Sequence, residues 1–390
     1  MSGKTQRITA LQQKLVEMDI DAAILVLSRD VFYYTGTSQP SILLVTPADY
    51  RLFVRRALPF VLAETWVDPG RIVYPGDFKE VLAGLKPAGI VRGRLGLELD
   101  VIPASLYLRL VRMFSEFEPV NISDQILRQR MRKDTGEVEL IRAAGGMVTR
   151  GHQRVLESLR EGMTELELAA EVEDAHRRAG HEGAFAMRNF DFFMSRGPLS
   201  SGENLFRVSG FANTITGVGL SPAMPAGPSR RVIEKGDTVI IDIPTCCQGY
   251  HFDETRTYVL GRASGGVRAL YSALREISDQ AAGALKAGAR VKDVYDTAST
   301  CASRLGVSDY FLGLAPNKAN FIGHGIGLEL NEPPVLFAGS DFELPESTVT
   351  TIEIHLTHPE HGAVKLEDTV LVTDAGCEFL SSTPRELFEV

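Results

Sequence analysis

Hydrophobic and polar positions follow two different periods along the first third of the chain. An amphipathic helix is predicted near the start because four apolar residues recur at helical spacing, namely Ile8, Leu11, Leu15 and Met18. The segments that follow predict three short strands and one further helix, at 22–27, 42–46, 95–100 and 103–117. Alternation of helices and strands is typical of an α/β domain.

A polar, basic stretch at 124–137 separates this region from a long helix that is predicted to begin near Glu137. Its charges are most simply a solvated helix face or a linker. We therefore place a domain boundary in this stretch, so that residues 1–128 form an N-terminal α/β domain and residues 129–390 form a second domain.

The second domain contains a faint internal repeat with an offset of 126 residues. Each copy has the form of a helix, a glycine turn, a second helix and a cap that ends in glycine. The matched positions are Leu159, Gly162, Glu167, Leu168, Arg178, Gly180 and Phe185 in the first copy and Leu285, Gly288, Asp293, Val294, Arg304, Gly306 and Phe311 in the second. The repeat predicts a duplicated α/β unit with a site between its halves, where pockets commonly form.

A predicted hairpin carries two aspartates on one face. Its two strand-like runs flank a turn at Gln248 and Gly249. This turn places Asp242 opposite Thr255 and makes Asp253 a diagonal neighbour of Asp242 on the same face. Burying an unpaired carboxylate costs free energy, so we expect a positively charged partner beside the two aspartates.

A second predicted hairpin repeats this pattern with two glutamates. A loop centred on Glu360 places Glu353 and Glu367 directly opposite one another on one face. Like charges that face each other across strands are destabilising unless a cation lies between them.

His324 lies between these two hairpins along the chain and is flanked by Gly323 and Gly325, which let the backbone pass close to a ligand. One imidazole with four carboxylates is an oxygen-rich donor set that suits two ions of Mn(II), Co(II), Zn(II) or Fe(II). Each residue alone is explained as easily by a surface position or a salt bridge. The five together favour a metal centre.

Composition and charge exclude several classes of function. The chain has 390 residues, of which 44% are hydrophobic and 23% charged, and a net charge of −9. These values are typical of a soluble globular protein and argue against nucleic acid or an anionic membrane as the main partner. No apolar run approaches the roughly 18 residues of a membrane span. The four cysteines lack the spacing of a disulfide framework, so we expect a cytoplasmic protein.

At the residues of the two hairpins and the histidine segment, the chain resembles the pita-bread metallopeptidases, which include Xaa-Pro aminopeptidases, prolidases, methionine aminopeptidases and the related creatinases. The matching motifs are "IID", "DETRT", "GHGIGLELNEPP", "TIE" and "KLEDTVLVT", with "VFYYTGTS" at 31–38 and "EVELIRAA" at 137–144. The resemblance covers nearly the whole chain. It implies an α/β (α+β) fold with a creatinase-like N-terminal domain and a pita-bread catalytic domain that has an internal pseudo-twofold duplication.

The resemblance also implies a ligand set for two divalent metal ions, among which Mn(II) is favoured. Its five members are Asp242, Asp253, His324, Glu353 and Glu367. Asp253 and Glu367 are expected to bridge the two ions. Arg256 is expected nearby, either orienting a carboxylate or forming a structural ion pair. A homodimer is expected because it is common in the family.

Two positions and one segment depart from the family pattern. The usual histidines are replaced by Ala226 in "AMPAG" and by Asn331 in "GLELNEPP". The segment 195–222 is also longer than a typical Xaa-Pro enzyme would have. These departures put the proton delivery and the substrate orientation of the usual peptidases in doubt.

The predicted function is a dinuclear metal-dependent hydrolase of the Xaa-Pro aminopeptidase or dipeptidase type, which cleaves small peptides by attack of a metal-bridged hydroxide. Two alternatives stay open, a non-peptidase member of the fold acting on a small amide metabolite and a catalytically silent binding protein. The candidate catalytic residues are Glu353 as the general base, His324, Asn331 as a hydrogen-bonding group for a carbonyl, and His355, which shares the strand parity of Glu353.

Overall fold

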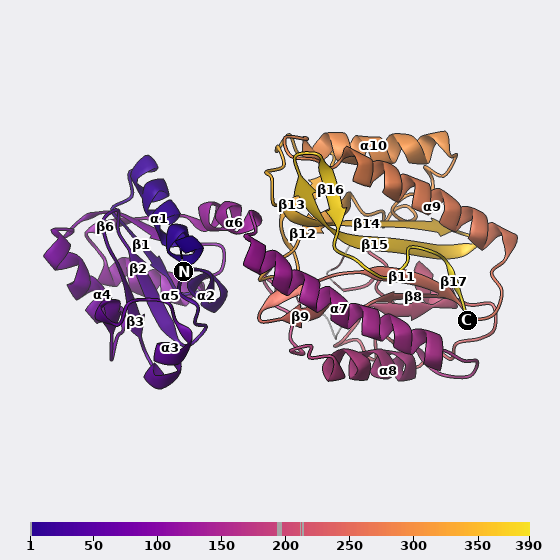
Figure 1. Cartoon of the computed structure of the whole chain (residues 1–390), viewed down its shortest axis with the longest axis horizontal. Coiled ribbons are helices and arrows are strands. Elements are labelled where there is room, and N and C mark those ends of the chain that lie inside the picture. Colours follow the sequence, from indigo (N-terminus) through magenta and orange to yellow (C-terminus); the bar gives the residue numbers. More distant parts are fainter. Residues whose placement is uncertain (1, 193–196, 211, 213) are drawn as a thin grey trace. The chain divides into compact units, whose positions relative to one another are not determined.

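A computed structural model describes residues 2–192, 197–210, 212 and 214–390. Residues 195, 196, 211 and 213 of the long segment 195–222 thus lie outside the described residues. The chain folds as two compact units, Met1–Arg130 and Met131–Val390 (Figure 1). None of the helices in the described ranges combines the length and the apolar character that a membrane crossing requires.

The N-terminal unit is built on a six-stranded sheet of order β4-β3-β2-β1-β5-β6. Its strands are β1 (Ala22–Leu25), β2 (Ser41–Val45), β3 (Tyr50–Val54), β4 (Ile72–Val73), β5 (Gly93–Leu97) and β6 (Phe117–Asn121). Its helices are α1 (Ser2–Glu17), α2 (Ser28–Thr35), α3 (Leu58–Glu64), α4 (Phe78–Leu85), α5 (Ala104–Met113) and α6 (Ser123–Met131). Strands β1, β5 and β6 are parallel neighbours, whereas β1, β2 and β3 pair antiparallel.

The predicted helix at 103–117 is wrong at its end. Helix α5 stops at Met113, and Phe117 begins the strand β6. Phe117 pairs with Gly93 of β5. Hydrogen bonds to a strand more than twenty residues away outweigh the local helical pattern here, as tertiary context often does.

The C-terminal unit is built on a nine-stranded sheet. The strands of the whole unit, including two that lie outside this sheet, are β7 (Leu199–Ser201), β8 (Thr238–Asp242), β9 (Thr245–Cys247), β10 (Tyr250–Phe252), β11 (Thr255–Val259), β12 (Phe321–Gly325), β13 (Glu332–Phe337), β14 (Val349–His358), β15 (Gly362–Thr373), β16 (Gly376–Phe379) and β17 (Phe388–Glu389). The main path runs β13-β12-β14-β15-β11-β8-β7; β16 adds to β15, β17 adds to β11, and β9 and β10 form a separate pair.

Four helices accompany this sheet, namely α7 (Thr135–Ser158), α8 (Glu165–Arg178), α9 (Gly265–Ala284) and α10 (Val291–Arg304). Along β14 and β15, side chains alternate between two buried faces. Ile352, Ile354 and Leu366 join the core under α9. Glu353 and Glu367, with the opposite parity, therefore project from the other face, which holds the candidate site.

The internal duplication is visible in the helices. Helices α8 and α10 have the same length of 14 residues, and they begin 126 residues apart, at Glu165 and Val291. In each copy the glycine before the helix has a positive φ, 87° at Gly162 and 79° at Gly288. Each copy also makes a β-bridge just before the helix, from Thr164 and Arg290. The offset predicted from the sequence is therefore confirmed.

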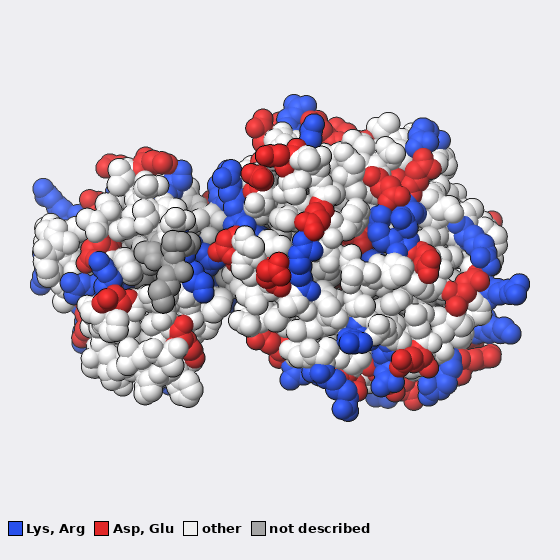
Figure 2. All heavy atoms as spheres, viewed as in Figure 1, with Lys and Arg blue, Asp and Glu red and all other residues white. Residues whose placement is uncertain are grey.

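Charged side chains are spread over the face shown in Figure 2, where basic and acidic residues alternate over the C-terminal unit. This distribution is typical of a solvated protein surface, and on this face no single-sign patch of the kind that binds nucleic acid is visible.

Candidate metal centre

Five side chains from five segments of the C-terminal unit meet on the polar face of its sheet. They are Asp242 at the end of β8, Asp253 just after β10, His324 in β12, Glu353 in β14 and Glu367 in β15. We call them the five-residue cluster. All five are buried, with at most 6% of their surface exposed.

The strand register brings these residues together as the hairpin patterns predict. Glu353 lies directly opposite Glu367, and Asp242 lies opposite Thr255. Thr255 is in turn paired with Glu367. The two acidic hairpins are thus joined through β11 and β15, a connection that neither turn could reveal by itself.

Two groups of three side chains in the cluster have ligand atoms close enough to hold a metal ion. One is Asp253, His324 and Glu367; the other is Asp242, Glu353 and Glu367; within each group the atoms lie within 4.8 Å of one another. Glu367 belongs to both groups. Within the part of the chain that the structure describes, its Oε1 atom is buried without a hydrogen-bond partner, whereas Thr255 Oγ1 donates to its Oε2 at 2.8 Å. An orphaned carboxylate oxygen shared by two groups fits a divalent cation.

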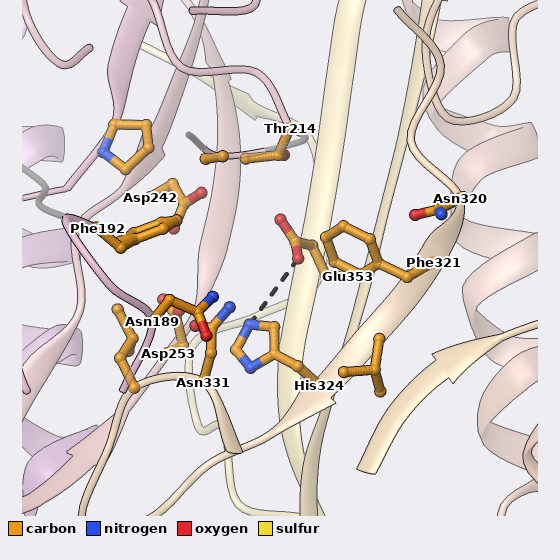
Figure 3. Close-up of a pocket in the computed structure, with 14 residues that line it drawn as sticks. Asn189, Phe192, Thr214, Asp242, Asp253, Asn320, Phe321, His324, Asn331 and Glu353 are labelled. Carbon is orange, nitrogen blue, oxygen red and sulfur yellow. Dashed lines mark ion pairs between the residues drawn. The ribbon is translucent and has the colours of Figure 1, made fainter. Parts of the chain in front are cut away.

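His324 presents a free lone pair to this cluster. Its Nδ1 lies 3.1 Å from the carbonyl oxygen of Gly325, which can only accept a hydrogen bond, so Nδ1 carries the proton. Nε2 then faces Glu353 Oε2 at 4.0 Å and Glu367 Oε1 at 3.9 Å, and the dashed line in Figure 3 marks the first of these distances. Burial lowers the pKa of His324, which favours the neutral ring that a metal ligand requires.

Lys365 is a further member of the site that the sequence reasoning missed. Its fully buried ammonium group bonds to Asp242 and lies 2.5 Å from Glu353 Oε1. It also lies 4.0 Å from Glu367 Oε2. Lys365 is two residues before Glu367 on β15, so strand parity could have placed it on the same face.

Burial is the largest influence on the pKa of every carboxyl group in the cluster. It raises the pKa of Asp242 and raises those of Asp253 and Glu367 well above their usual range, with neighbouring carboxylates adding to the last two. Glu353 differs, because the charges of Lys365 and His324 and the hydrogen bond from Lys365 together outweigh burial and lower its pKa to about 2. The raised pKa values mean that Asp253 and Glu367 favour the protonated, neutral form unless a cation lies beside them.

Arg256 lies behind the cluster and forms structural ion pairs. Its Nη2 lies 2.8 Å from Asp368 Oδ1 and 3.3 Å from Glu254 Oε2, and its Nη1 donates to the backbone carbonyl of Glu367 at 2.6 Å. Of the two roles considered from the sequence, the geometry supports the structural one, since the guanidinium contacts the backbone of Glu367 and not its carboxylate.

A cavity of about 270 Å³ borders the cluster, and Asp242, Asp253, His324 and Glu353 line it (Figure 3). Its other walls combine aromatic rings with neutral polar groups, chiefly Phe192, Phe321, Asn189, Thr214 and Asn331. Pro198, Ala212 and Thr214 come from the long segment 195–222. A partly apolar cavity with a few convergent polar groups has the character of a small-molecule site.

Two residues considered from the sequence lie away from this cavity wall. His355 is buried on the same face as Glu353 and pairs with Lys365 across the strands, but it is not among the residues that line the cavity. Burial, followed by the charge of Lys365, lowers its pKa to about 4. Ala226 does not line the cavity either. Asn331 does line it.

His251 supports the site through the backbone. Its Nε2 accepts a hydrogen bond from the backbone N–H of Ala186 at 3.0 Å, so its Nδ1 carries the proton and donates to the carbonyl of Gly327 at 3.0 Å. His251, which is two residues before Asp253, thus links the backbone at Ala186 to the backbone at Gly327, three residues after His324.

Comparison with known proteins identifies the family. The sequence model of Metallopeptidase family M24 matches residues 139–374, more than half of the chain, and that of the Creatinase/Prolidase N-terminal domain matches residues 7–132. The chain belongs to metallopeptidase family M24. Membership confirms the predicted family, the two-part α/β fold and the class of hydrolases.

Proteins named as peptidases are similar to this chain over most of its length. A probable dipeptidase, PepE of Mycobacterium tuberculosis, is 31% identical over 79% of this chain and 75% of its own length. The Xaa-Pro dipeptidase of Pyrococcus furiosus is 29% identical over 98% of this chain and 99% of its own length. The crystal structure of X-Pro aminopeptidase from Thermotoga maritima superposes with a TM-score of 0.79 at 27% identity, covering 97% of this chain and 98% of that one.

Proposed function

We propose that this M24 protein is a dinuclear metal-dependent peptidase that cleaves small peptides, of the dipeptidase or Xaa-Pro type named for its relatives. The observation that carries the proposal is the pair of three-residue groups that share Glu367 at the wall of a substrate-sized cavity. The five-residue cluster would hold two divalent ions, with Mn(II) as the first candidate and with Asp253 and Glu367 as the bridging ligands. A homodimer and a cytoplasmic location stay predictions.

When bound, divalent ions supply a hydroxide nucleophile near neutral pH and polarise the carbonyl that is attacked. Glu353 is the general base of the proposal. Its Oε1 is held by Lys365, so Oε2 is the oxygen that accepts a proton from the attacking water and passes it to the leaving nitrogen. His324, neutral and fixed by its bond to Gly325, holds its Nε2 toward the same space.

Asn331 and Asn189 orient the substrate in this proposal. Both line the cavity, and a carboxamide can donate to a peptide carbonyl and accept from a peptide N–H. Neither can deliver a proton at neutral pH, so the proton that the leaving nitrogen needs is assigned to Glu353. Phe192 and Phe321 supply apolar walls for a side chain of the substrate.

A second candidate function is hydrolysis of a small amide metabolite. It is favoured by Asn331, which takes a position where the usual peptidases have a histidine, and by the neutral polar lining formed with Asn189 and Thr214. Both functions use the same five-residue cluster and differ only in the substrate that the cavity admits.

The test is to load the purified protein with Mn(II) or Co(II) and to incubate it with dipeptides and tripeptides that include Xaa-Pro members. Mass spectrometry follows cleavage, and elemental analysis counts the metal ions. Glu353→Gln should lose at least about 100-fold in rate, whereas Glu346→Gln, which changes an exposed glutamate just before β14, should cleave like the wild type. Equal cleavage by Glu353→Gln would contradict the proposal. Two bound ions without any peptide cleavage would favour small amides.

A further inference from the structure

The N-terminal unit contains a cavity of its own, of about 410 Å³. This volume is within the range of small-molecule sites. Its lining comes from β2, α4, α5 and the first residue of α2, from the segments that follow β1, β3 and β5, and from the two residues before β2. None of these residues belongs to the five-residue cluster or to the cavity beside it.

The position of this cavity in the sheet is one at which α/β folds bind ligands. Val26 and Leu27 directly follow β1, and Val101 and Ile102 follow its parallel neighbour β5. The chain leaves β1 for α2, which packs with α1, and leaves β5 for α5, whose Leu110 shares a hydrophobic cluster with Phe78 of α4 and with Ile24. Where neighbouring parallel strands continue to different faces of a sheet, a crevice opens at their carboxyl ends.

One buried polar atom in this cavity lacks a partner. The side chain of Ser41, at the start of β2, is only 7% exposed, and its Oγ atom has no hydrogen-bond partner among the described residues. Ser41 lines the cavity. Leaving such a hydroxyl unpaired is destabilising, so a ligand atom that bonds to it would remove this cost.

Two arginines give the cavity a positive charge. Arg55 follows β3 and Arg109 lies on α5, and both are exposed and line the cavity. Within the described residues neither forms an ion pair with a carboxylate; the guanidinium of Arg109 lies over the ring of Phe78, 5.7 Å from its centroid. Free guanidinium groups bind carboxylate and phosphate groups through two parallel hydrogen bonds.

The backbone at the start of α2 does not provide the anion site. The N–H groups of Val26 and Leu27 both donate to Glu98 Oε2, at 2.6 and 3.0 Å. Selectivity for an anion therefore depends on the two arginines. Apart from Ser28 and Gln39, the remaining walls are apolar, including Ile42, Phe78 and Leu106, and fit a hydrophobic body.

We propose that this cavity binds a small molecule with one carboxylate head group on an apolar body of about the size of a phenyl ring. Arg55 and Arg109 bind the head group, Ser41 bonds to a polar atom of the ligand, and Phe78 packs against its body. The proposal is independent of the proposed peptidase function, since it concerns a different cavity in a different unit of the chain.

The test is isothermal titration calorimetry on the full chain with 3-phenylpropionate, its neutral amide and phenyl phosphate. The acid should bind about 10- to 100-fold more tightly than the amide, which corresponds to one charge-assisted hydrogen-bond set. Arg55→Gln combined with Arg109→Gln should weaken binding of the acid by a similar factor. A charge-matched control, Arg56→Gln with Arg112→Gln, changes neighbouring arginines that do not line the cavity and should bind like the wild type.

Three results would overturn the existence of the site, and a fourth would overturn its preference for a carboxylate. These are no binding of any probe to the wild type, equal affinity for the acid and the amide, or unchanged binding by the Arg55 and Arg109 double variant, which would locate the probe elsewhere. Ser41→Ala provides a variant that leaves both arginines in place and should bind the acid several-fold more weakly, about 1 kcal/mol on the affinity scale. Tighter binding of phenyl phosphate than of the acid would overturn the assignment of a carboxylate head group.

Discussion

The ammonium group of Lys365 lies 2.5 Å from Glu353 Oε1 on the adjacent strand, in the middle of a cluster of buried carboxylates. It also bonds to Asp242. One ammonium group compensates one of the four carboxylates of the five-residue cluster when all are ionised. Charge balance therefore requires further cations, which is the condition under which a divalent metal ion binds well.

Replacing Lys365 with Met should destabilise the protein without metal and increase the effect of metal. Two carboxylates would lose their buried partner, which costs about 3–5 kcal/mol, and the more negative site should bind Mn(II) more tightly. The free energy of unfolding in urea, measured by circular dichroism with EDTA and with Mn(II), checks this. Lys286→Met, at an exposed position, is the control. If metal stabilises the variant and the wild type equally, the charge of Lys365 does not affect metal binding, and the prediction is wrong.

Thr255 and Thr257 form a matched pair for testing how Glu367 is held. Thr255 Oγ1 donates to Glu367 Oε2, whereas Thr257 Oγ1 donates to the backbone carbonyl of Lys365. Thr255→Val should therefore weaken metal binding about 10- to 100-fold, and Thr257→Val should cost stability but leave metal affinity nearly unchanged. Competition with a fluorescent chelator measures both affinities. Equal affinities in the two variants would contradict a specific role for Thr255.

The strand register of the candidate site could be predicted from the sequence because turns fix it. With a loop centred on Glu360, a period of two places Glu353 opposite Glu367, and the structure has this pair. The same parity argument applies to Lys365, two residues before Glu367. A lysine is not a ligand for these metal ions, so a pattern of metal-ligating residues does not point to it.

Other features depend on contacts between distant segments. The strand β6 begins at Phe117 only because β5 offers it a partner. Arg256 finds its acceptors at Asp368, Thr383 and Pro384, more than a hundred residues away. The local sequence does not determine which buried carboxylate will pair with Arg256, so its structural role is visible only in the folded structure.

Arg256 should contribute strongly to stability because it neutralises buried acids. Arg256→Met would leave Glu254 and Asp368 without this partner and would release the backbone carbonyl of Glu367. We expect a loss of about 3–5 kcal/mol in the free energy of unfolding. Arg290→Met removes an exposed pair with Asp293 and should cost much less stability than Arg256→Met. Urea unfolding compares the two, and equal losses would contradict the structural role.

His176 should make the stability of the protein depend on pH. Its ring is 1% exposed and packs so closely against α7 that a Cβ atom at Gly151 would lie 2.1 Å from Nε2. Burial, followed by the charge of His181, lowers its pKa to about 4, from about 6.5 in an unfolded chain. A lowered pKa means that the unfolded state binds the proton first. The contribution of His176 is therefore present above pH 6.5 and is lost as the pH falls toward 4.

Replacing His176 with Leu removes this titration. Between pH 7 and pH 5 the wild type should lose about 2 kcal/mol more of its free energy of unfolding than the variant. The measurement is urea unfolding by circular dichroism, since the single tryptophan, Trp66, reports on the N-terminal unit alone. The comparison at pH 7 accounts for any packing that the variant loses, because that loss is the same at both pH values. If both proteins lose the same free energy of unfolding between pH 7 and pH 5, the lowered pKa of His176 does not cause the pH dependence of stability.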